Sequence, residues 1–147
     1  MTEIVLSFDY GRKKIGIAVG RTSTGLAEGI ATIPTNPSEL LWVKINTLIQ
    51  EWQPDTLVVG LPLALDGHEP AFVRYTRQFG GQLNSRFKLP VHFVDETLTT
   101  DFADAIIRET TGSGKRITAR RKLIRDRLAA ELILTTYLNE YTITETG

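Results

Sequence analysis

Short continuous apolar runs and longer stretches of helical spacing alternate along this chain. Three runs, at residues 4–8, 15–19 and 26–33, come first and predict three successive strands that pair as antiparallel neighbours. Two further runs, at residues 56–60 and 90–94, each follow a helical segment. Because the run at 56–60 does not alternate with polar residues, it predicts a parallel strand that is buried on both faces.

Helical spacing predicts four helices. The first covers residues 39–52, where apolar side chains recur every three or four positions, and Ser38 before it is a good N-cap residue. The other helices are expected at about residues 70–87, from residue 99 or 100 to about 110, and at about 119–141.

The order of these elements predicts an α/β fold. Three strands, a helix, a strand, a helix and a strand, followed by at least two helices, form a three-layer domain with a mixed sheet. At 147 residues, one domain spanning residues 1–147 is expected. Ligands of such sheets gather at the carboxyl ends of the strands, near a switch in strand order. The residues that follow the strands are therefore the first candidates for a site.

Composition narrows the class of protein. Hydrophobic residues make up 41% and charged residues 23% of the chain, which is ordinary for a soluble globular protein. No apolar run approaches the roughly 18 residues of a membrane helix, and the chain enters a strand directly, so we expect no signal peptide, no membrane partner and a cytoplasmic location. The absence of cysteine excludes disulfides, thiolate metal sites and thiol catalysis.

Three carboxylates occupy positions where they can converge. Asp9 follows the first predicted strand, Glu96 follows the last, and Asp126 lies on the final helix. Apolar residues four, seven and eleven positions after Asp126 share its helix face, which should pack on the sheet. Three neighbouring carboxylates repel one another unless a cation joins them, and Mg²⁺ is a hard cation with a preference for oxygen ligands.

Each of these acids also has a simpler interpretation. Asp9 alone could form a turn, Glu96 could be an exposed loop acid, and Asp126 could pair with Lys122 one turn earlier. Two of the acids follow predicted strands and the third lies on the packing face of a helix. Taken together, these positions favour a shared site over the three separate roles. His92, in the last strand, is expected to have a structural role, and Trp42 on the first helix is expected to pack.

Basic residues are unevenly distributed although the formal net charge is zero. The first predicted turn carries Arg12, Lys13 and Lys14 between two glycines. A second cluster precedes and surrounds Asp126 on the final helix, and it comprises Lys115, Arg116, Arg120, Arg121, Lys122, Arg125 and Arg127. A solvated helix face and a phosphate-binding strip both remain open for this cluster.

Four motifs in order resemble the YqgF family, also called RuvX, whose members are RNase H-like proteins described as pre-16S ribosomal RNA nucleases or as Holliday junction resolvase-like. The resemblance extends from Leu6 to Tyr141. Its matching segments are residues 8–11 with 15–19, residues 58–63 with 66–67, residues 94–100, and Asp126 with 129–130 and 133–134. The chain departs from the family pattern at residues 64, 65 and 68 and in the approach to Asp126.

The resemblance implies an RNase H-like three-layer fold, with a mixed five-stranded sheet flanked by helices. It also implies a metal-dependent nuclease site at Asp9, Glu96 and Asp126 that holds Mg²⁺ or Mn²⁺. The implied substrate is the precursor of 16S ribosomal RNA, with the ribosomal particle as a further partner, and the implied protein is a monomer or a homodimer. The basic residues of the first turn and of the segment 115–125 would then bind nucleic acid.

Three other functions compete with this interpretation. A Holliday junction resolvase would use the same chemistry on branched DNA and would need two symmetric sites, hence a dimer. A non-catalytic nucleic-acid-binding module is disfavoured because all three acids are present. An actin-like or sugar-kinase ATPase would need a duplicated fold, for which 147 residues leave no room.

Overall fold

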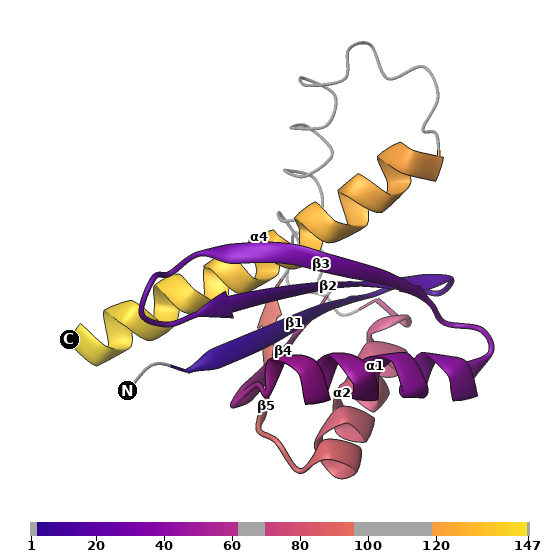
Figure 1. The fold of residues 1–147 in the computed structure, drawn as a ribbon, viewed down its shortest axis with the longest axis horizontal. Helices are drawn as coiled ribbons and strands as arrows, with labels where there is room; N and C mark the ends of the chain where they lie inside the picture. The colour runs from indigo at the N-terminus through magenta and orange to yellow at the C-terminus, as the bar shows by residue number, and fades with distance from the viewer. Residues whose placement is uncertain (1–2, 62–69, 96–118, 147) are drawn as a thin grey trace.

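A mixed sheet of five strands forms the middle layer of the computed structural model, which describes residues 3–61, 70–95 and 119–146 (Figure 1). The strand order is β3-β2-β1-β4-β5. β1 pairs antiparallel with β2 and parallel with β4, so the sheet changes direction at β1. The bounds are β1 Ile4–Tyr10, β2 Lys14–Arg21, β3 Ala27–Pro34, β4 Thr56–Leu61 and β5 Val91–Asp95.

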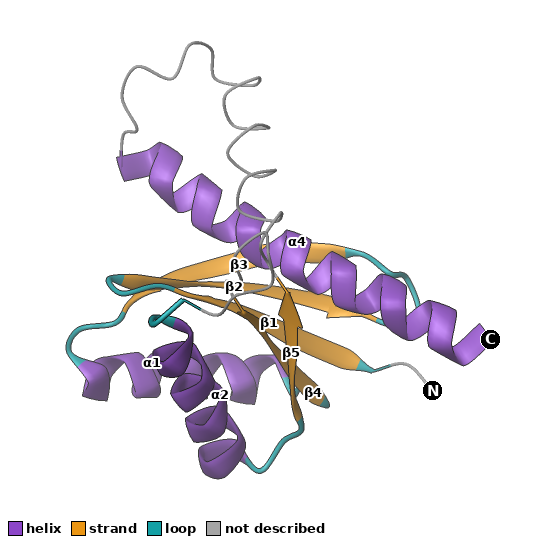
Figure 2. Cartoon of the chain, turned by 180° about the vertical axis from the view of Figure 1, so that it is seen from behind, coloured by secondary structure: helices purple, strands orange, loops and turns teal. Residues whose placement is uncertain are grey.

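Helices cover both faces of this sheet (Figure 2). On one face lie α1 (Ser38–Trp52) and α2 (Val73–Phe87), and on the other lies α4 (Ala119–Thr146). The three-layer α/β fold with a mixed five-stranded sheet is therefore confirmed. Within the described ranges, none of the helices has the length and apolar character of a membrane-spanning segment.

Alternation along β1 divides the core into two parts. Leu6 and Phe8 point to α1 and α2, where Phe8 meets Phe79 in an edge-to-face contact with ring centroids 5.7 Å apart. Val5 lies in the other core cluster, together with Ile133 of α4. Since successive strand residues face opposite sides, the apolar run at 4–8 serves both cores.

The hairpin between β1 and β2 is held by backbone contacts. Gly11 has no room for a side chain, because an added Cβ would lie 2.6 Å from the carbonyl oxygen of Lys14. Thr35, after β3, binds the same turn twice: its N–H donates to the carbonyl of Lys13 at 2.9 Å, and its hydroxyl donates to the carbonyl of Arg12 at 2.6 Å. Gly11 therefore allows the tight turn that the sequence predicted.

Several predicted boundaries need correction. Ser38 is the first helical residue of α1 rather than its cap; Pro37 occupies the N-cap position, and no side chain caps it. α2 begins at Val73 instead of residue 70, because a turn precedes it. Asp9, which was expected just after the first strand, lies inside β1. The helix predicted from residue 99 or 100 to 110 lies outside the described residues.

Candidate active site

Asp9 occupies a position between two glycines near the carboxyl end of β1. It is paired with Gly16 of β2. On the other side, the parallel register with β4 ends at Phe8 and Val59, so Gly60 is the next residue along β4. Because neither glycine carries a side chain, the neighbouring strands leave space beside the half-buried Asp9 carboxylate.

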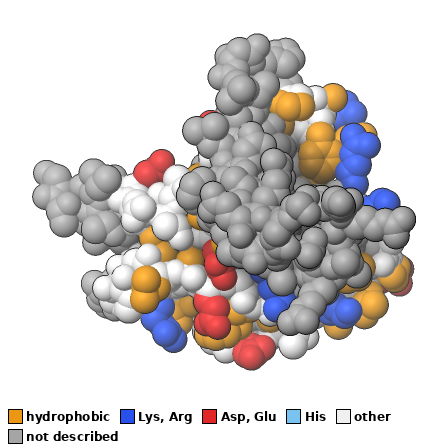
Figure 3. Space-filling view, turned by 90° about the horizontal axis from the view of Figure 1, so that it is seen from above, with side chains coloured by type: hydrophobic (Ala, Val, Ile, Leu, Met, Phe, Trp, Pro, Cys, Tyr) orange, Lys and Arg blue, Asp and Glu red, His pale blue; other side chains and the backbone are white. Residues whose placement is uncertain are grey.

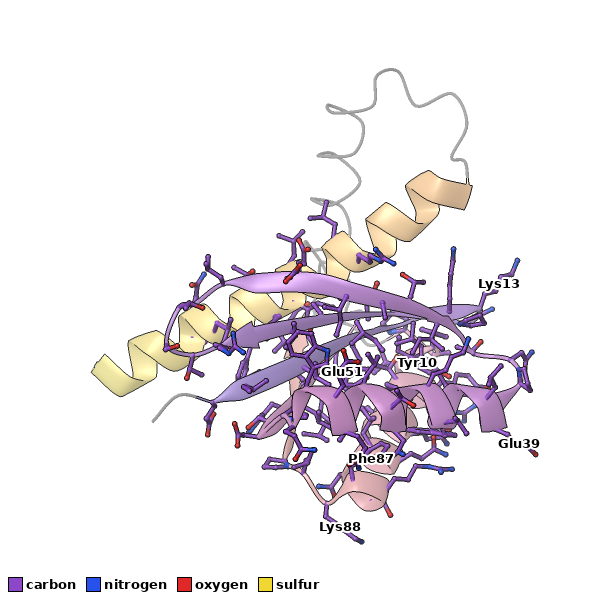
Figure 4. The ribbon with its side chains drawn as sticks, in the orientation of Figure 1. Tyr10, Lys13, Glu39, Glu51, Phe87 and Lys88 are labelled. Carbon is purple, nitrogen blue, oxygen red and sulfur yellow. The ribbon has the colours of Figure 1, made fainter. Side chains whose placement is uncertain are left out.

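The Asp9 side chain lies on the α4 side of the sheet. Ser7, two positions earlier, donates a buried hydrogen bond of 2.7 Å from its hydroxyl to the carbonyl of Ala130 in α4. Residues two apart in a strand share a face, so Asp9 shares that of Ser7. Tyr10 belongs to the opposite face, between the sheet and α1 (Figure 4).

α4 approaches the sheet closely at this point, which the small side chains of Ala129 and Ala130 allow; both residues are buried. Gly29 of β3 forms a second contact: its N–H donates to the Glu131 carboxylate at 2.6 Å, and an added Cβ would lie 2.7 Å from the Cβ of Arg127. Gly29 and Ser7 thus fix the turn of α4 that comes directly after residue 126.

Further along α4, Tyr137 packs on the same face of the sheet but at its opposite edge, against β5. Its ring stacks on His92 of β5 with centroids 5.6 Å apart, which fits the structural role expected for His92. Burial, with a smaller contribution from the Glu3 carboxylate, raises the pKa of Tyr137 above 10.0. Since Glu3 precedes β1, the carboxyl end of α4 lies toward the start of β1, and its N-terminal part extends toward the β1–β2 turn (Figure 1).

The structure describes only the backbone of one of the other two predicted acids. The backbone of Asp126 lies in α4, one turn before Ala130, but its side chain is outside the described part of the structure. Glu96 directly follows β5 in sequence and is also outside it. Among the described residues, no three acidic or histidine side chains form a group that could hold a metal ion. The convergence of Asp9, Glu96 and Asp126 stays a prediction.

The predicted basic residues divide in the same way. Arg12 and Lys13 are exposed at the β1–β2 turn, and Lys14 is half-buried at the start of β2. In the view from above, most of the Lys and Arg side chains that are drawn lie toward this end of the molecule (Figure 3). Of the second cluster, Arg127 is exposed. Lys115 and Arg116 lie outside the described residues, and only the backbone is described for Arg120, Arg121, Lys122 and Arg125.

Two aromatic residues near the site were not predicted from sequence. Phe72, just before α2, stacks on Tyr10 with ring centroids 5.7 Å apart, and Arg12 lies over the Phe72 ring at 5.2 Å. Tyr75 lies beside Phe72 at 6.2 Å. The sequence does place aromatic and basic residues together at 72–75. Helical periodicity alone, however, does not show that these residues lie next to β1.

A family model described as "RuvX: Holliday junction resolvase" matches residues 3–140 of the chain. The chain belongs to the RuvX family. A relative from Aeromonas hydrophila is 42% identical and covers 92% of this chain and 94% of its own length. A relative from Methylobacillus flagellatus is 39% identical and covers 92% and 90%. Both carry the name "Putative pre-16S rRNA nuclease".

Solved structures share the fold of this RuvX chain. Thermus thermophilus RuvC aligns over 96% of this chain and 97% of its own with a TM-score of 0.57 and 14% identity. Fowlpox virus resolvase, solved with Holliday junction DNA, aligns over 94% and 98% with a TM-score of 0.58 and 14% identity. The RNase H-like fold implied by the sequence motifs is therefore confirmed.

Proposed function

We propose that this RuvX chain is a metal-dependent nuclease that processes the precursor of 16S ribosomal RNA in the cytoplasm. One observation carries the proposal: the Asp9 carboxylate lies between Gly16 and Gly60, on the face of the sheet that α4 crosses. An acid whose neighbours on the two adjacent strands are glycines has room beside it for a cation and a phosphate. The names of relatives about 40% identical to this chain supply the substrate.

Asp126 is the second acid of the proposed site. Ala130 contacts Ser7, and residue 126 precedes Ala130 by four residues, a rise of about 6 Å along the helix axis. Asp9 is two residues beyond Ser7, which is about 6.6 Å along β1 in the same general direction. Asp9 and Asp126 are thus displaced from the Ser7–Ala130 contact by similar distances in the same direction. We infer that their carboxylates lie close together near the carboxyl end of β1.

Glu96 is the third. It comes two positions after Val94, whose side chain belongs to the core cluster on the α4 side. Strand alternation favours the same side for Glu96. Three carboxylate oxygens form a donor set that fits Mg²⁺ or Mn²⁺. Bound by these acids, such an ion would lower the pKa of a coordinated water and stabilise charge on the phosphate.

The basic residues of the turn would hold the RNA backbone. Arg12 and Lys13 are exposed and follow Asp9 closely in sequence, so their charges are available to phosphates next to the site. Such contacts make binding strongly dependent on salt and nearly independent of sequence. The acids of this chain would thus orient the reacting phosphate while the turn retains the rest of the strand.

A Holliday junction resolvase is the second candidate, favoured by the description of the matching family. Cleavage by the wild type distinguishes the two. We expect precursor ribosomal RNA to be cleaved with Mg²⁺ or Mn²⁺ and to remain intact with a chelator, whereas a four-way DNA junction is cut more slowly. Preferential cleavage of the junction by a dimer would favour the resolvase, and cleavage of neither substrate would contradict the nuclease proposal.

A further inference from the structure

Aromatic rings and arginines form a continuous row at the end of the sheet that carries Asp9. The row starts at Tyr10, whose ring stacks on Phe72 at an interplanar angle of 29°. The guanidinium of Arg12 lies 5.2 Å from the centre of the Phe72 ring. Since Tyr10 follows Asp9 directly in β1, the row begins one residue from the proposed site.

The row continues outward along the first turn of α2. Tyr75 lies 6.2 Å from Phe72, and the Arg74 guanidinium lies 5.4 Å from the centre of the Tyr75 ring. Tyr75 is 46% exposed, and Arg12 and Arg74 are both exposed. We call Arg12, Phe72, Arg74 and Tyr75 the aromatic–arginine strip.

Packing explains Phe72 but leaves Tyr75 without a structural reason. Phe72 is half-buried against Tyr10, which itself packs against Phe79 of the core at 4.9 Å. Tyr75, by contrast, keeps nearly half of its surface in solvent. The first turn of α2, which carries Arg74 and Tyr75, contains no acidic residue.

We propose that the aromatic–arginine strip binds unpaired bases of the RNA beside the phosphate that is cleaved. Bases in single strands stack on aromatic rings and on arginine guanidinium planes, and basic side chains between the rings bind the phosphates. Paired bases are stacked within their own helix and cannot use such a surface, so the strip favours unpaired over duplex RNA. This inference rests on the proposed nuclease function, whose site it extends.

The chain contains a matched pair of arginines for testing the inference. Arg86, near the other end of α2, lies 4.2 Å from the ring centre of Trp42 in α1 and is exposed like Arg74. Phe87 and Lys88 mark that end of α2, away from Lys13 and the β1–β2 turn (Figure 4). Arg74→Gln and Arg86→Gln therefore remove the same charge from similar surroundings at opposite ends of one helix.

The experiment measures the dissociation constants of a labelled single-stranded RNA and of an RNA duplex, in chelator so that nothing is cleaved. Tyr75→Leu should weaken single-strand binding by about fivefold or more while changing duplex binding by less than about twofold. Tyr75→Trp keeps a ring and should retain wild-type affinity. Arg74→Gln should weaken single-strand binding, and Arg86→Gln should leave it unchanged.

Equal losses on single strand and duplex with Tyr75→Leu, or no loss on either, would overturn the inference. So would an Arg86→Gln variant that loses as much affinity as Arg74→Gln. Because these measurements need no cleavage, they are independent of the nuclease proposal. A protein that prefers single strands through Tyr75 but cleaves no RNA would leave the strip in place and contradict the proposed function alone.

Discussion

A glycine in β3, which has no side chain, allows the close approach of α4 to the sheet. At Gly29, an added Cβ would lie 2.7 Å from the Cβ of Arg127 and 3.2 Å from its carbonyl oxygen. Neither atom is at the end of a flexible side chain, so the helix itself would have to move. Gly81 in α2 is the opposite case, because an added Cβ there would meet nothing within 4 Å.

Gly29→Ala should therefore lower the free energy of unfolding by about 1–3 kcal/mol. Because α4 also carries Asp126, the same variant should slow RNA cleavage. Gly81→Ala is the control and should raise the free energy of unfolding by about 0.5–1 kcal/mol, since alanine is the better helix former. Denaturant unfolding measures both. If the two variants were equally stable, the close approach of α4 at Gly29 would be wrong.

Tyr137 should make the free energy of unfolding depend on pH in alkaline solution. Its pKa is raised in the folded protein, mainly by burial, so folding favours the neutral phenol. The stabilisation is complete below about pH 10 and is lost as the pH rises through the higher folded pKa. Above about pH 10, the wild type should lose stability more steeply than Tyr137→Phe. Parallel pH profiles for the two proteins, measured by denaturant unfolding, would refute this assignment.

At the scale of elements, α4 connects the core to the proposed site. Its contacts with Ser7 and Gly29 come from two different strands, and both fall within one turn of Ala130. The position of residue 126 is set by these contacts rather than by the propensity of the helix. Small displacements at this turn should therefore affect catalysis before they affect the fold.

Ser7→Ala tests this coupling. Loss of the buried hydroxyl that donates to Ala130 should lower the free energy of unfolding by about 0.5–1.5 kcal/mol and reduce the rate of RNA cleavage. Thr47→Ala removes an exposed hydroxyl that donates to the carbonyl of Val43 in α1, and it should change stability by less than about 0.5 kcal/mol without changing the rate. Identical cleavage rates for the two variants would contradict a positioning role of Ser7.

The elements themselves were largely predictable, and their contacts were not. Periodicity located the strands and the helices because each must bury one face or two. It misplaced the start of α1, since Ser38 has the chemistry of a cap but Pro37 occupies that position. It also missed the stack of Phe72 on Tyr10, which depends on how α2 lies against β1. Of the candidate site, Asp9 and Glu96 were predicted from their places near strand ends and Asp126 from its helix face, whereas the glycine neighbours of Asp9 follow from the register of three strands.

The molecule as a whole has two cores that share one sheet. One contains Leu6 and Phe8 against α1 and α2, and the other contains Val5 and Ala130. Because adjacent residues of β1 belong to different cores, neither core can persist if the strand is lost. We therefore propose that the chain is a single domain.

This proposal predicts one cooperative unfolding transition. Far-ultraviolet circular dichroism, which reports helices and strands, and tryptophan fluorescence, which reports Trp42 and Trp52 of α1, should give the same midpoint in denaturant. Separate midpoints would show that α1 unfolds independently of α4 and would contradict a single domain.

The central claim is that Asp9 is a catalytic carboxylate, and the most direct test is the rate of precursor ribosomal RNA cleavage with Mg²⁺. Asp9→Asn should reduce the rate by about two orders of magnitude or more, because the amide is a poor ligand for a divalent ion. Glu51→Gln is the control, since it removes one negative charge from an exposed position of α1, and α1 and α4 lie on opposite faces of the sheet. Both variants should unfold like the wild type. An Asp9→Asn variant that is correctly folded and cleaves the precursor at the wild-type rate would contradict the account.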